Sequence, residues 1–444
     1  MQPPELPAAE LSRLVREAQA DQRIPSISAA AFARGEVVWQ EARGLARIPE
    51  RIEATPDTQY RIGSITKTFT AAAILQLRDA GALDLDDPLA AHLSGAEHGT
   101  ATLRRLLSHR SGLQREFPGR VWETLEFPDR ESLLGGLAGA EQVLPGGARW
   151  HYSNLAFGLL GEVIARSSGL GYEDYVRERL LEPLGLERTT FEPVEPAAGG
   201  YLVEPYSDRA RAEPDVVKKA LAAAGSLWST TADLAHWADA LVDGAEGVLS
   251  PDTAAEMRRF QSMADLERWR LGWGLGVMLM REGDRILIGH GGAMPGFLTG
   301  VAISPSERAG AVVLANSGAG AEIEELVRRL AALIADAYPA EPDAWLPAGT
   351  VPPEVEPLLG RWWSEGAEVV IRYRSGRLEA RPAAAPADVP SSVFAVEGEG
   401  RFRGISGPEE GELLEVVRGP NGTVSKLYWA TYPLTRSPQQ PFGG

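Results

Sequence analysis

The stretch between Gly63 and Gly81 constrains the fold of this chain more than any other. From Ser64 to Ala80 it contains no proline and no glycine, and Gly81 is a residue type that commonly ends a helix. Its middle, residues 69–77, is apolar almost all the way round, so we expect a buried helix over residues 64–80. Ser64 lies on the first turn of this helix, and Lys67 follows three residues later on the same face.

A serine and a lysine in this arrangement suit acyl transfer. The serine hydroxyl becomes a good nucleophile when a base takes its proton, and burial can lower the pKa of a lysine until it serves as that base. The start of a helix adds free backbone N–H groups and a partial positive charge beside the serine oxygen. Ser64 and Lys67 are therefore candidates for a nucleophile and its base.

The bare Ser-x-x-Lys pattern also has a simpler interpretation, a serine at a helix start followed by a solvated lysine. The pattern arises roughly once by chance in a chain of ordinary composition and this length. Of the 44 Lys and Arg residues only four are lysines, namely Lys67, Lys218, Lys219 and Lys426, and only Lys67 follows a serine by three. Arginine cannot give up its proton in a protein, whereas lysine can. The choice of lysine here favours the catalytic interpretation and leaves both open.

Composition excludes several classes of function. Asp and Glu number 61 against 44 Lys and Arg, so the net charge is −17, and we expect neither nucleic acid nor an anionic membrane as a partner. The chain has no cysteine, which excludes disulfides and thiolate chemistry. The N-terminal residues Met-Gln-Pro-Pro-Glu-Leu lack the basic and apolar regions of a signal peptide, and no apolar run reaches the length of a membrane span. These features predict a cytoplasmic protein.

Strand patterns open and close the first part of the chain, and helical patterns fill its middle. We expect helices over 8–20, 103–108, 132–137, 154–167, 172–181, 231–240, 251–261 and 321–337, and strands over 26–34, 36–44, 273–280, 285–290, 297–303 and 310–315. Terminal strands in one sheet with a helical region between them predict two lobes with a cleft between them.

The C-terminal part has a different pattern. Residues 339–357 hold several prolines and little periodicity, which is typical of a linker. Short alternating runs follow at 368–373, 377–381, 392–396, 413–417 and 425–429, separated by Gly, Pro and Asn turns. We therefore predict a first domain over residues 1–340, a linker over 341–356 and a small all-β barrel or sandwich over 357–444.

A second candidate motif is Tyr152-Ser-Asn154, at the start of a predicted helix. Asparagine is as rare in this chain as lysine, occurring only as Asn154, Asn316 and Asn421. One interpretation is a helix N-cap with an aromatic contact. The other is that Tyr152 and Asn154 line the cleft, since a tyrosine near a lysine can titrate low and move protons while an amide holds a carbonyl group.

A third candidate motif, His290-Gly291-Gly292-Ala293, ends a predicted strand, and its glycines let another group approach the backbone closely. It is not a phosphate loop, because no Gly-Lys-Ser/Thr follows it, and the chain lacks the Gly-x-Ser-x-Gly elbow of lipases. The simpler interpretation is a β-bulge near a turn. The six histidines show no metal-ligand spacing, so we expect no metal site.

Together these motifs resemble those of the serine β-lactamase and penicillin-binding protein superfamily. The match is closest to the branch with class C β-lactamases, D-aminopeptidases, D-alanyl-D-alanine carboxypeptidases and related esterases. The family's Ser-x-x-Lys, Tyr-x-Asn and Lys-Thr-Gly or His-x-Gly motifs match residues 64–67, 152–154 and 290–292 in order, and segments 106–113 and 224–233 are also similar to family segments. The resemblance implies an α/β fold, with an antiparallel sheet flanked by helices and a mainly helical lobe. D-Aminopeptidases of this branch carry lipocalin-like barrels after the catalytic domain, which is the expectation for the all-β tail.

The resemblance also implies roles for single residues. Ser64 would attack an acyl carbonyl and form an acyl-enzyme, while Lys67 and Tyr152 would move protons, with the base in each step left open. Asn154 would hold the acyl-side carbonyl of the substrate. The backbone N–H groups of Ser64 and Ala293 would form the oxyanion hole.

The third motif departs from the class C β-lactamases, which usually carry lysine where this chain has His290. A histidine is mostly neutral near pH 7, so it offers no fixed cation to a substrate carboxylate. We therefore expect a D-aminopeptidase, D-peptidase or esterase that acts without a cofactor on small molecules or short peptides. The alternatives are a β-lactamase, a D-alanyl-D-alanine carboxypeptidase or a non-catalytic penicillin-binding sensor. The sequence leaves the oligomeric state open.

Overall fold

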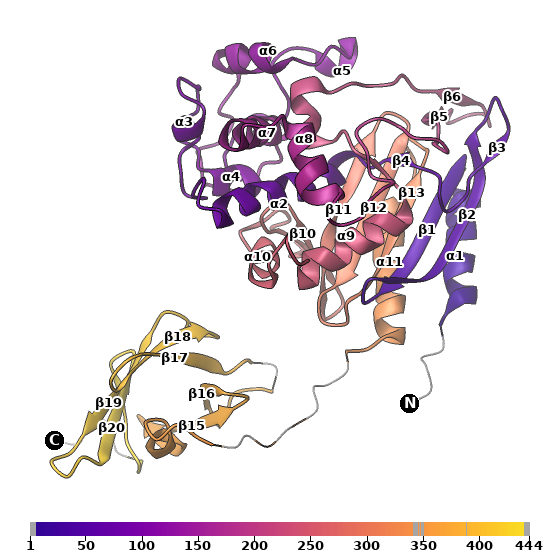
Figure 1. Ribbon diagram of the computed structural model, residues 1–444. Helices are drawn as coiled ribbons and strands as arrows, with labels where there is room; N and C mark the ends of the chain where they lie inside the picture. Colours follow the sequence, from indigo (N-terminus) through magenta and orange to yellow (C-terminus); the bar gives the residue numbers. More distant parts are fainter. Residues whose placement is uncertain (1–5, 341–344, 346, 348–349, 388, 439–444) are drawn as a thin grey trace. The chain divides into compact units, whose positions relative to one another are not determined.

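The computed structural model describes residues 6–340, 345, 347, 350–387 and 389–438 (Figure 1). The chain divides into two compact units, Met1–Glu341 and Pro342–Gly444, which are described separately below. The predicted linker over 341–356 lies partly outside the described residues. Within the described residues, no helix has both the length and the apolar character needed to cross a membrane.

The first unit is built on a nine-stranded sheet whose neighbouring strands all run antiparallel. Along the sheet the order is β3-β2-β1-β13-β12-β11-β10-β9-β8, so the first strands of the chain pair with the last of this unit. The strands are β1 Ser26–Ala33, β2 Glu36–Arg47, β3 Ile52–Glu53, β8 Ser262–Met263, β9 Leu271–Trp273, β10 Met278–Glu282, β11 Arg285–Met294, β12 Phe297–Ser304 and β13 Ala309–Ala315. The predicted single sheet of terminal strands is confirmed.

Helices cover both faces of this sheet. They are α1 Ala8–Asp21, α2 Thr66–Asp79, α3 Leu89–His92, α4 Leu103–Leu107, α5 Val121–Thr124, α6 Arg130–Gly135, α7 Asn154–Ser168, α8 Tyr172–Val176, α9 Thr231–Asp243, α10 Pro251–Met257 and α11 Ile323–Ala337. Four single-turn segments accompany them, η1 Gly63–Ile65, η2 Gly136–Gly139, η3 Arg177–Leu181 and η4 Lys219–Ala224. Figure 1 shows α2 to α8 gathered into a helical lobe beside the sheet.

The alternation of side chains along each strand separates two apolar cores. Ile27 and Ala29 of β1 belong to the core under α1 and α11, whereas Phe32 belongs to the larger core shared with α2, α7 and α9. The strand β13 is buried along its whole length because both of its faces are covered. The sheet is therefore a rigid middle layer, and the helical lobe packs against one of its faces.

The structure corrects several predicted boundaries. The strand expected over 273–280 is two strands, β9 and β10, because Gly276 takes a φ of 72° and turns the chain between them. The helix expected over 251–261 ends at Met257. The helix expected over 172–181 is α8 followed by the wider turn η3. The strand expected over 36–44 extends further, because β2 ends at Arg47, and the short strand β3 follows where no strand was expected.

Two small sheets lie outside the main one. The strand β4 (Tyr60–Arg61) pairs with β7 (Trp228–Ser229), and β5 (Tyr201–Val203) pairs with β6 (Ala210–Ala212). Because β4 comes directly before Ser64, its pairing with β7 fixes where the chain enters the turn that carries this serine.

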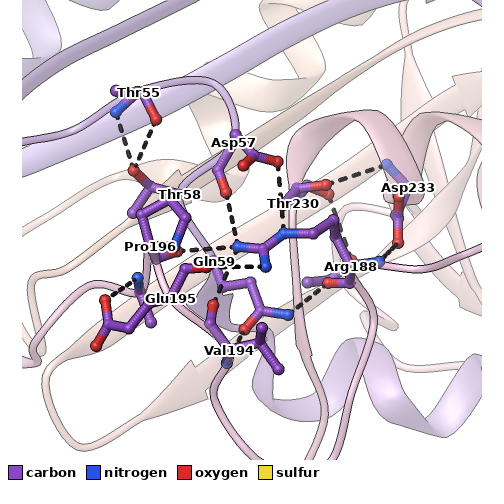
Figure 2. Close-up of polar contacts among 12 residues, drawn as sticks. Thr55, Asp57, Thr58, Gln59, Arg188, Val194, Glu195, Pro196, Thr230 and Asp233 are labelled. Atoms are coloured by element: carbon purple, nitrogen blue, oxygen red, sulfur yellow. Dashed lines mark hydrogen bonds and ion pairs between the residues drawn. The ribbon is translucent and has the colours of Figure 1, made fainter.

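A group of polar contacts around Arg188, which we call the Arg188 clasp, fastens the same entry segment (Figure 2). The Arg188 guanidinium donates to the carbonyl oxygens of Asp57, Val194, Glu195 and Pro196 at 3.0–3.2 Å. Its Nε lies 3.4 Å from an Asp57 carboxylate oxygen. Five donors in a fixed fork suit arginine to binding several carbonyl groups at once. The clasp therefore ties the residues before β4 to the loop after Arg188.

The second unit is a meander of eight antiparallel strands in sequence order. They are β14 Gly360–Ser364, β15 Ala367–Arg374, β16 Arg377–Pro382, β17 Ser392–Gly398, β18 Arg401–Ser406, β19 Leu413–Arg418, β20 Val424–Trp429 and β21 Tyr432–Leu434, preceded by the turn η5 Glu356–Leu358. A bridge between Trp363 and Thr435 brings the first strand to the last, so the barrel is nearly closed. The predicted all-β, barrel-like fold is confirmed, although β14, β18 and β21 were not among the expected strands.

Side chains fill the interior of this barrel. Trp362 is fully buried, donates from Nε1 to the carbonyl of Leu358 at 2.7 Å, and lies under the guanidinium of Arg436 at 3.8 Å from its ring centre. Arg436 in turn donates to the carbonyls of Leu359 and Arg361, both at 3.0 Å. A cation over an aromatic face, with its donors satisfied, stabilises this end of the barrel.

Candidate active site

The turn that carries Ser64 has a tighter geometry than the sequence predicts. The expected helix over 64–80 begins as the 3₁₀ turn η1, Gly63–Ile65, and continues as α2, Thr66–Asp79. Gly63 has a φ of 50°, which a residue with a side chain rarely adopts. The apolar middle of α2 is buried as predicted, since Phe69 through Leu75 are all fully enclosed.

Two glycines let strand β11 lie directly against the segment before Ser64. A Cβ atom on Gly63 would be 2.8 Å from the backbone nitrogen of Ala293, and one on Gly292 would be 2.0 Å from the carbonyl oxygen of Ile62. Any side chain at these positions would push the two backbones apart. The first and third motifs are therefore in contact through their main chains, as an oxyanion hole built from Ser64 and Ala293 requires.

Lys67 lies directly below Ser64 and is fully buried. Its Nζ lies 3.0 Å from the Ser64 Oγ, 2.7 Å from Asn154 Oδ1 and 2.5 Å from the carbonyl oxygen of Ala224. A charged Lys67 would donate an N–H in all three contacts, whereas a neutral Lys67 donates to Asn154 and Ala224 and directs its lone pair at the hydroxyl of Ser64, the predicted nucleophile. The solvated-lysine interpretation is wrong, because no part of this side chain reaches water.

The surroundings of Lys67 favour its neutral form. Burial holds the pKa of Lys67 well below its usual value, and the nearby charges of Lys218 and Arg115 lower it further, while Glu116 acts in the opposite direction. The rings of Tyr152 and Phe157 flank its Nζ, with ring centres at 5.0 Å and 5.4 Å. A neutral amine 3.0 Å from a serine hydroxyl is arranged to accept that hydroxyl's proton.

Tyr152 reaches the same place from the start of α7, but its environment acts in the other direction. Burial raises the pKa of Tyr152, and a hydrogen bond with Ser64 offsets this only in part. The expectation that this tyrosine titrates low is therefore wrong, because loss of water outweighs the attraction of the nearby cations. The ring of His109 packs on Tyr152 with centres 4.3 Å apart, and His109 Nδ1 accepts a hydrogen bond from Ser153 N.

Asn154 connects Lys67 to an acidic residue that sequence reasoning missed. Asn154 is the first residue of α7, and the N-cap is its neighbour Ser153, whose side chain accepts from Ala156 N at 3.0 Å. The Asn154 amide nitrogen donates to Glu116 Oε1 at 2.6 Å. Glu116 follows segment 106–113 closely, but nothing in the local sequence indicates that it faces Asn154.

His290 lies on β11 with only 3% of its surface exposed. Its Nδ1 is 2.5 Å from the carbonyl oxygen of Gly291, so this nitrogen carries the hydrogen. Burial lowers the pKa of His290 to about 3, and a proton on Lys67 would act in the same direction. The expectation of a neutral histidine at this motif agrees with this environment, and Nε2 is left with a lone pair and no partner among the described residues.

A cavity of about 930 Å³ opens above these groups. Ser64, Tyr152 and the run His290–Ala293 line it, together with Trp150, Trp273 and Glu324, which sequence reasoning did not single out. Lys67 is sealed beneath Ser64, and Asn154, which is hydrogen-bonded to it, keeps 7% of its surface exposed. The structure thus brings together all eight predicted site residues, from three separate parts of the chain. Within the described residues no group of three His, Cys, Asp or Glu side chains is placed to hold a metal ion.

Comparisons with known proteins agree with this arrangement. Residues 11–336 match the β-lactamase family, and residues 351–436 match a domain of unknown function, DUF7586. Penicillin-binding protein 4 of Amycolatopsis lactamdurans is 30% identical over 370 residues, which are 78% of this chain and 95% of that protein. β-Lactamase-like protein 2 of Dictyostelium discoideum is 29% identical over 253 residues, 51% of this chain. The chain spans 44% of the length of this second relative.

Solved structures share the fold. An octameric penicillin-binding protein homologue from Pyrococcus abyssi superposes with a TM-score of 0.67 over 97% of this chain and all of its own, at 23% identity. SurE in complex with D-Leu has a TM-score of 0.62 over 97% of this chain and 99% of its own, at 25% identity. D-Amino acid amidase from Ochrobactrum anthropi SV3 has a TM-score of 0.62 over 74% of this chain and 99% of its own, at 26% identity. The family match, the fold and the three motifs lead to one conclusion, that the chain belongs to the β-lactamase family, within the serine β-lactamase and penicillin-binding protein superfamily.

Proposed function

We propose that this protein is a serine hydrolase that cleaves small amides or esters through an acyl-enzyme on Ser64. The observation that carries the proposal is the contact between Ser64 Oγ and Lys67 Nζ, 3.0 Å long, beneath an open cavity of about 930 Å³. The serine is at the surface of that cavity, and the lysine is sealed from water. This is the arrangement that activates a serine without a histidine.

The chemical step assigns a role to each group. Ser64 Oγ bonds to the carbonyl carbon as its proton passes to the neutral Nζ of Lys67. The backbone N–H groups of Ser64 and Ala293 stabilise the oxyanion that forms. Lys67 is the proposed base for this step rather than Tyr152, because burial disfavours both a lysine cation and a tyrosine anion. Tyr152, still protonated, is placed to donate a proton to the leaving group as the proton held by Lys67 replaces it, so that Tyr152 ends the step protonated and Lys67 neutral.

Asn154 has two proposed roles. Its oxygen holds Lys67, and its nitrogen uses one N–H to bind Glu116, so a second N–H is left for the acyl-side carbonyl of a substrate. Gly291 and Gly292 have no side chains, so the wall of the cavity stays thin beside His290. A Cβ on Gly291 would lie 2.3 Å from a Glu324 carboxylate oxygen, so a side chain there would displace Glu324 from the rim.

The most favoured substrates are D-amino-acid amides, short D-peptides and small esters. The uncharged His290 offers no cation to a substrate carboxylate, which argues against a dedicated β-lactamase. A D-amino acid amidase and a protein solved with D-Leu share the fold, which supports D-residues as substrates. The likeness to a penicillin-binding protein supports the second candidate, a protein that is acylated by β-lactams. A cytoplasmic location stays a prediction.

A substrate panel tests the proposal directly. Purified protein and Ser64→Ala are compared on p-nitrophenyl esters, on D- and L-amino-acid p-nitroanilides and on nitrocefin. We expect turnover of esters and of D-anilides in preference to L-anilides, and none by Ser64→Ala. Intact-mass analysis after a fluorophosphonate probe should show one adduct, on the peptide that contains Ser64. An adduct that survives in Ser64→Ala would contradict the assignment, and stable acylation without turnover would favour the penicillin-binding sensor.

A further inference from the structure

A second lysine is buried close to the proposed site. Lys218 precedes the turn η4 and has only 4% of its surface exposed, whereas its neighbour Lys219 is exposed. Lysine is among the residue types least often buried, because its charge loses water. The chain holds only four lysines, and two of them are buried in the same region. This arrangement calls for a physical explanation.

The contacts of Lys218 place its charge beside the turn that carries the nucleophile. Its Nζ lies 3.1 Å from the position that a Cβ on Gly225 would occupy, and the carbonyl carbon of Gly63 lies 3.3 Å from the same position. A side chain at position 225 would be tight against both groups and would move the Lys218 ammonium group by a few tenths of an ångström. The Trp122 ring lies on another side, with its centre 5.2 Å from Nζ. Among the residues that the structure describes, Nζ makes no hydrogen bond and no ion pair, and it is not one of the fully buried unpaired nitrogens, so it keeps a small contact with solvent.

Lys67 and Lys218 approach the same short piece of backbone. Lys67 donates to the carbonyl of Ala224 at 2.5 Å, and Gly225, the next residue, is the one that Lys218 faces. The other charged or titratable groups around this pair are Arg61, Arg115, Glu116, His109, Tyr152 and His290. Only one of them, Glu116, is acidic, so two buried lysines share a single carboxylate. Two protonated lysines so placed repel each other, and the repulsion is little screened because Lys67 is fully buried and Lys218 is only 4% exposed.

We propose that Lys218 is a positioning residue of the acyl-transfer site, whose positive charge beside Ala224 and Gly225 keeps Lys67 in the neutral form that accepts the Ser64 proton. This inference rests on the proposed function. Lys218 does not touch the reacting atoms and takes no proton from Ser64. Its effect is electrostatic, since a charge on Lys218 makes protonation of Lys67 less favourable. The direction of this effect agrees with the lowered pKa of Lys67, to which Lys218 is the largest contributor after burial.

The pKa of Lys218 itself sets the highest pH at which Lys218 can act on Lys67. Burial lowers it to about 8, with Arg61 acting in the same direction and Glu116 in the opposite one. Lys218 therefore keeps its charge at pH 6–7.5, where the neutral form of Lys67 is hardest to maintain. Above pH 8 Lys218 loses its proton, and its electrostatic effect on Lys67 is lost with it.

The test is the pH dependence of single-turnover acylation by a fluorophosphonate in Lys218→Met. Without the Lys218 charge, Lys67 binds a proton more readily, so the acidic limb of the profile should move to higher pH by about one unit, with an unchanged plateau. Below the limb this is about a tenfold lower rate. Lys219→Met is the matched control, one residue away and exposed, and its profile should coincide with wild type. Lys218→Arg keeps the charge and should keep the limb in place.

A second measurement separates this inference from the proposed function. In protein labelled with [¹³C]lysine, four lysines give four Cε signals, and Lys67→Arg identifies the one from Lys67. Its titration midpoint should rise in Lys218→Met and stay in place in Lys219→Met, whether or not the protein turns over any substrate. An unmoved midpoint in folded Lys218→Met would overturn the inference. A Lys218→Arg variant with a limb displaced as far as that of Lys218→Met would do the same. Absence of a Ser64 adduct in wild type would contradict the proposed function alone.

Discussion

Arg188 and Lys67 are basic residues of the first unit, the one 21% exposed and the other fully buried, and the groups around them differ in kind. Arg188 donates to four backbone carbonyl groups and lies against the Asp57 carboxylate (Figure 2). Lys67 contacts a hydroxyl, an amide oxygen and one carbonyl oxygen, and within the described residues no carboxylate lies at ion-pair distance from it. The Arg188 clasp therefore stabilises a charge, whereas the surroundings of Lys67 disfavour one.

This difference separates a structural cation from a chemical one. Arginine stays protonated in any protein environment and its fork binds several acceptors, so it can fasten loops but cannot serve as a base. Burial without a carboxylate partner lowers the pKa of a lysine, so lysine can serve as a base where arginine cannot. The chain uses arginine almost everywhere and reserves buried lysine for the neighbourhood of Ser64. An unpaired buried lysine is thus the clearest mark of the proposed active site.

The largest expected effect is that of Lys67→Arg, which puts at position 67 the residue type found at Arg188. Arginine keeps the charge but cannot give up its proton, so acylation should be at least about 10²-fold slower, the lower end of the loss typical for a proton-transfer group. The measurement is single-turnover acylation of the purified variant, with melting temperature as the folding control. A folded variant within a few-fold of wild type would reduce Lys67 to an electrostatic role and make Tyr152 the base.

The converse change, Arg188→Lys, should affect stability and leave the chemistry intact. Lysine keeps the positive charge but cannot donate to carbonyls on several sides at once, so we expect the free energy of unfolding to fall by about 2 kcal/mol. Urea unfolding measures this loss. The acylation rate per folded molecule should stay within about twofold of wild type, since a clasp of this kind holds a loop and moves no proton. A rate that falls while stability is kept would show that the clasp positions Ser64.

Much of the difference between Arg188 and Lys67 could be predicted from the sequence, but only where neighbouring residues or residue counts carry the information. The three motifs, the buried helix after Ser64 and the rarity of lysine are visible in neighbouring residues or in simple counts. They predict the nucleophile, its partners and the fold. The clasp was not visible, because Arg188 binds residues 57 and 194–196, which come together only through tertiary structure.

The same limit explains the residues that were missed at the site. Glu116 reaches Asn154 from 38 positions away, and Lys218 meets Gly63 only after the helical lobe has folded. The error on Tyr152 has a related cause. Proximity to a lysine suggests a low pKa, but burial raises it, and the extent of burial cannot be judged from a motif.

A third prediction concerns the neutral wall of the cavity. His290→Lys would place a cation beside Gly291, so the ratio of kcat/KM for substrates with a carboxylate near the scissile bond to that for neutral esters should rise about tenfold, the value of one charge-assisted hydrogen bond. His290→Gln is the matched control, because it is polar but uncharged, and it should leave the ratio unchanged. An unchanged ratio in the lysine variant would indicate that His290 does not face the substrate.

The smallest expected effect is a difference in how the two cations link stability to pH. Burial lowers the pKa of Lys67 in the folded state, whereas the unfolded chain binds that proton up to pH ~10.4. Between these two values the unfolded state holds more protons, so the Lys67 contribution to the free energy of unfolding rises with pH, by at most about 1.4 kcal/mol per pH unit. Arg188 stays protonated in both states and contributes no such slope.

Urea unfolding of wild type, Lys67→Met and Arg188→Met between pH 7 and 9 measures this difference. The free energy of unfolding of wild type minus that of Lys67→Met should rise with pH. Only the wild type has to release the Lys67 proton when it folds, and this release costs less free energy as the pH rises. The stability of wild type relative to Arg188→Met should stay level across the same range. Level differences for both variants would mean that Lys67 is protonated in the folded state throughout this range. It would then be a fixed cation like Arg188, and a base other than Lys67 would have to take the Ser64 proton.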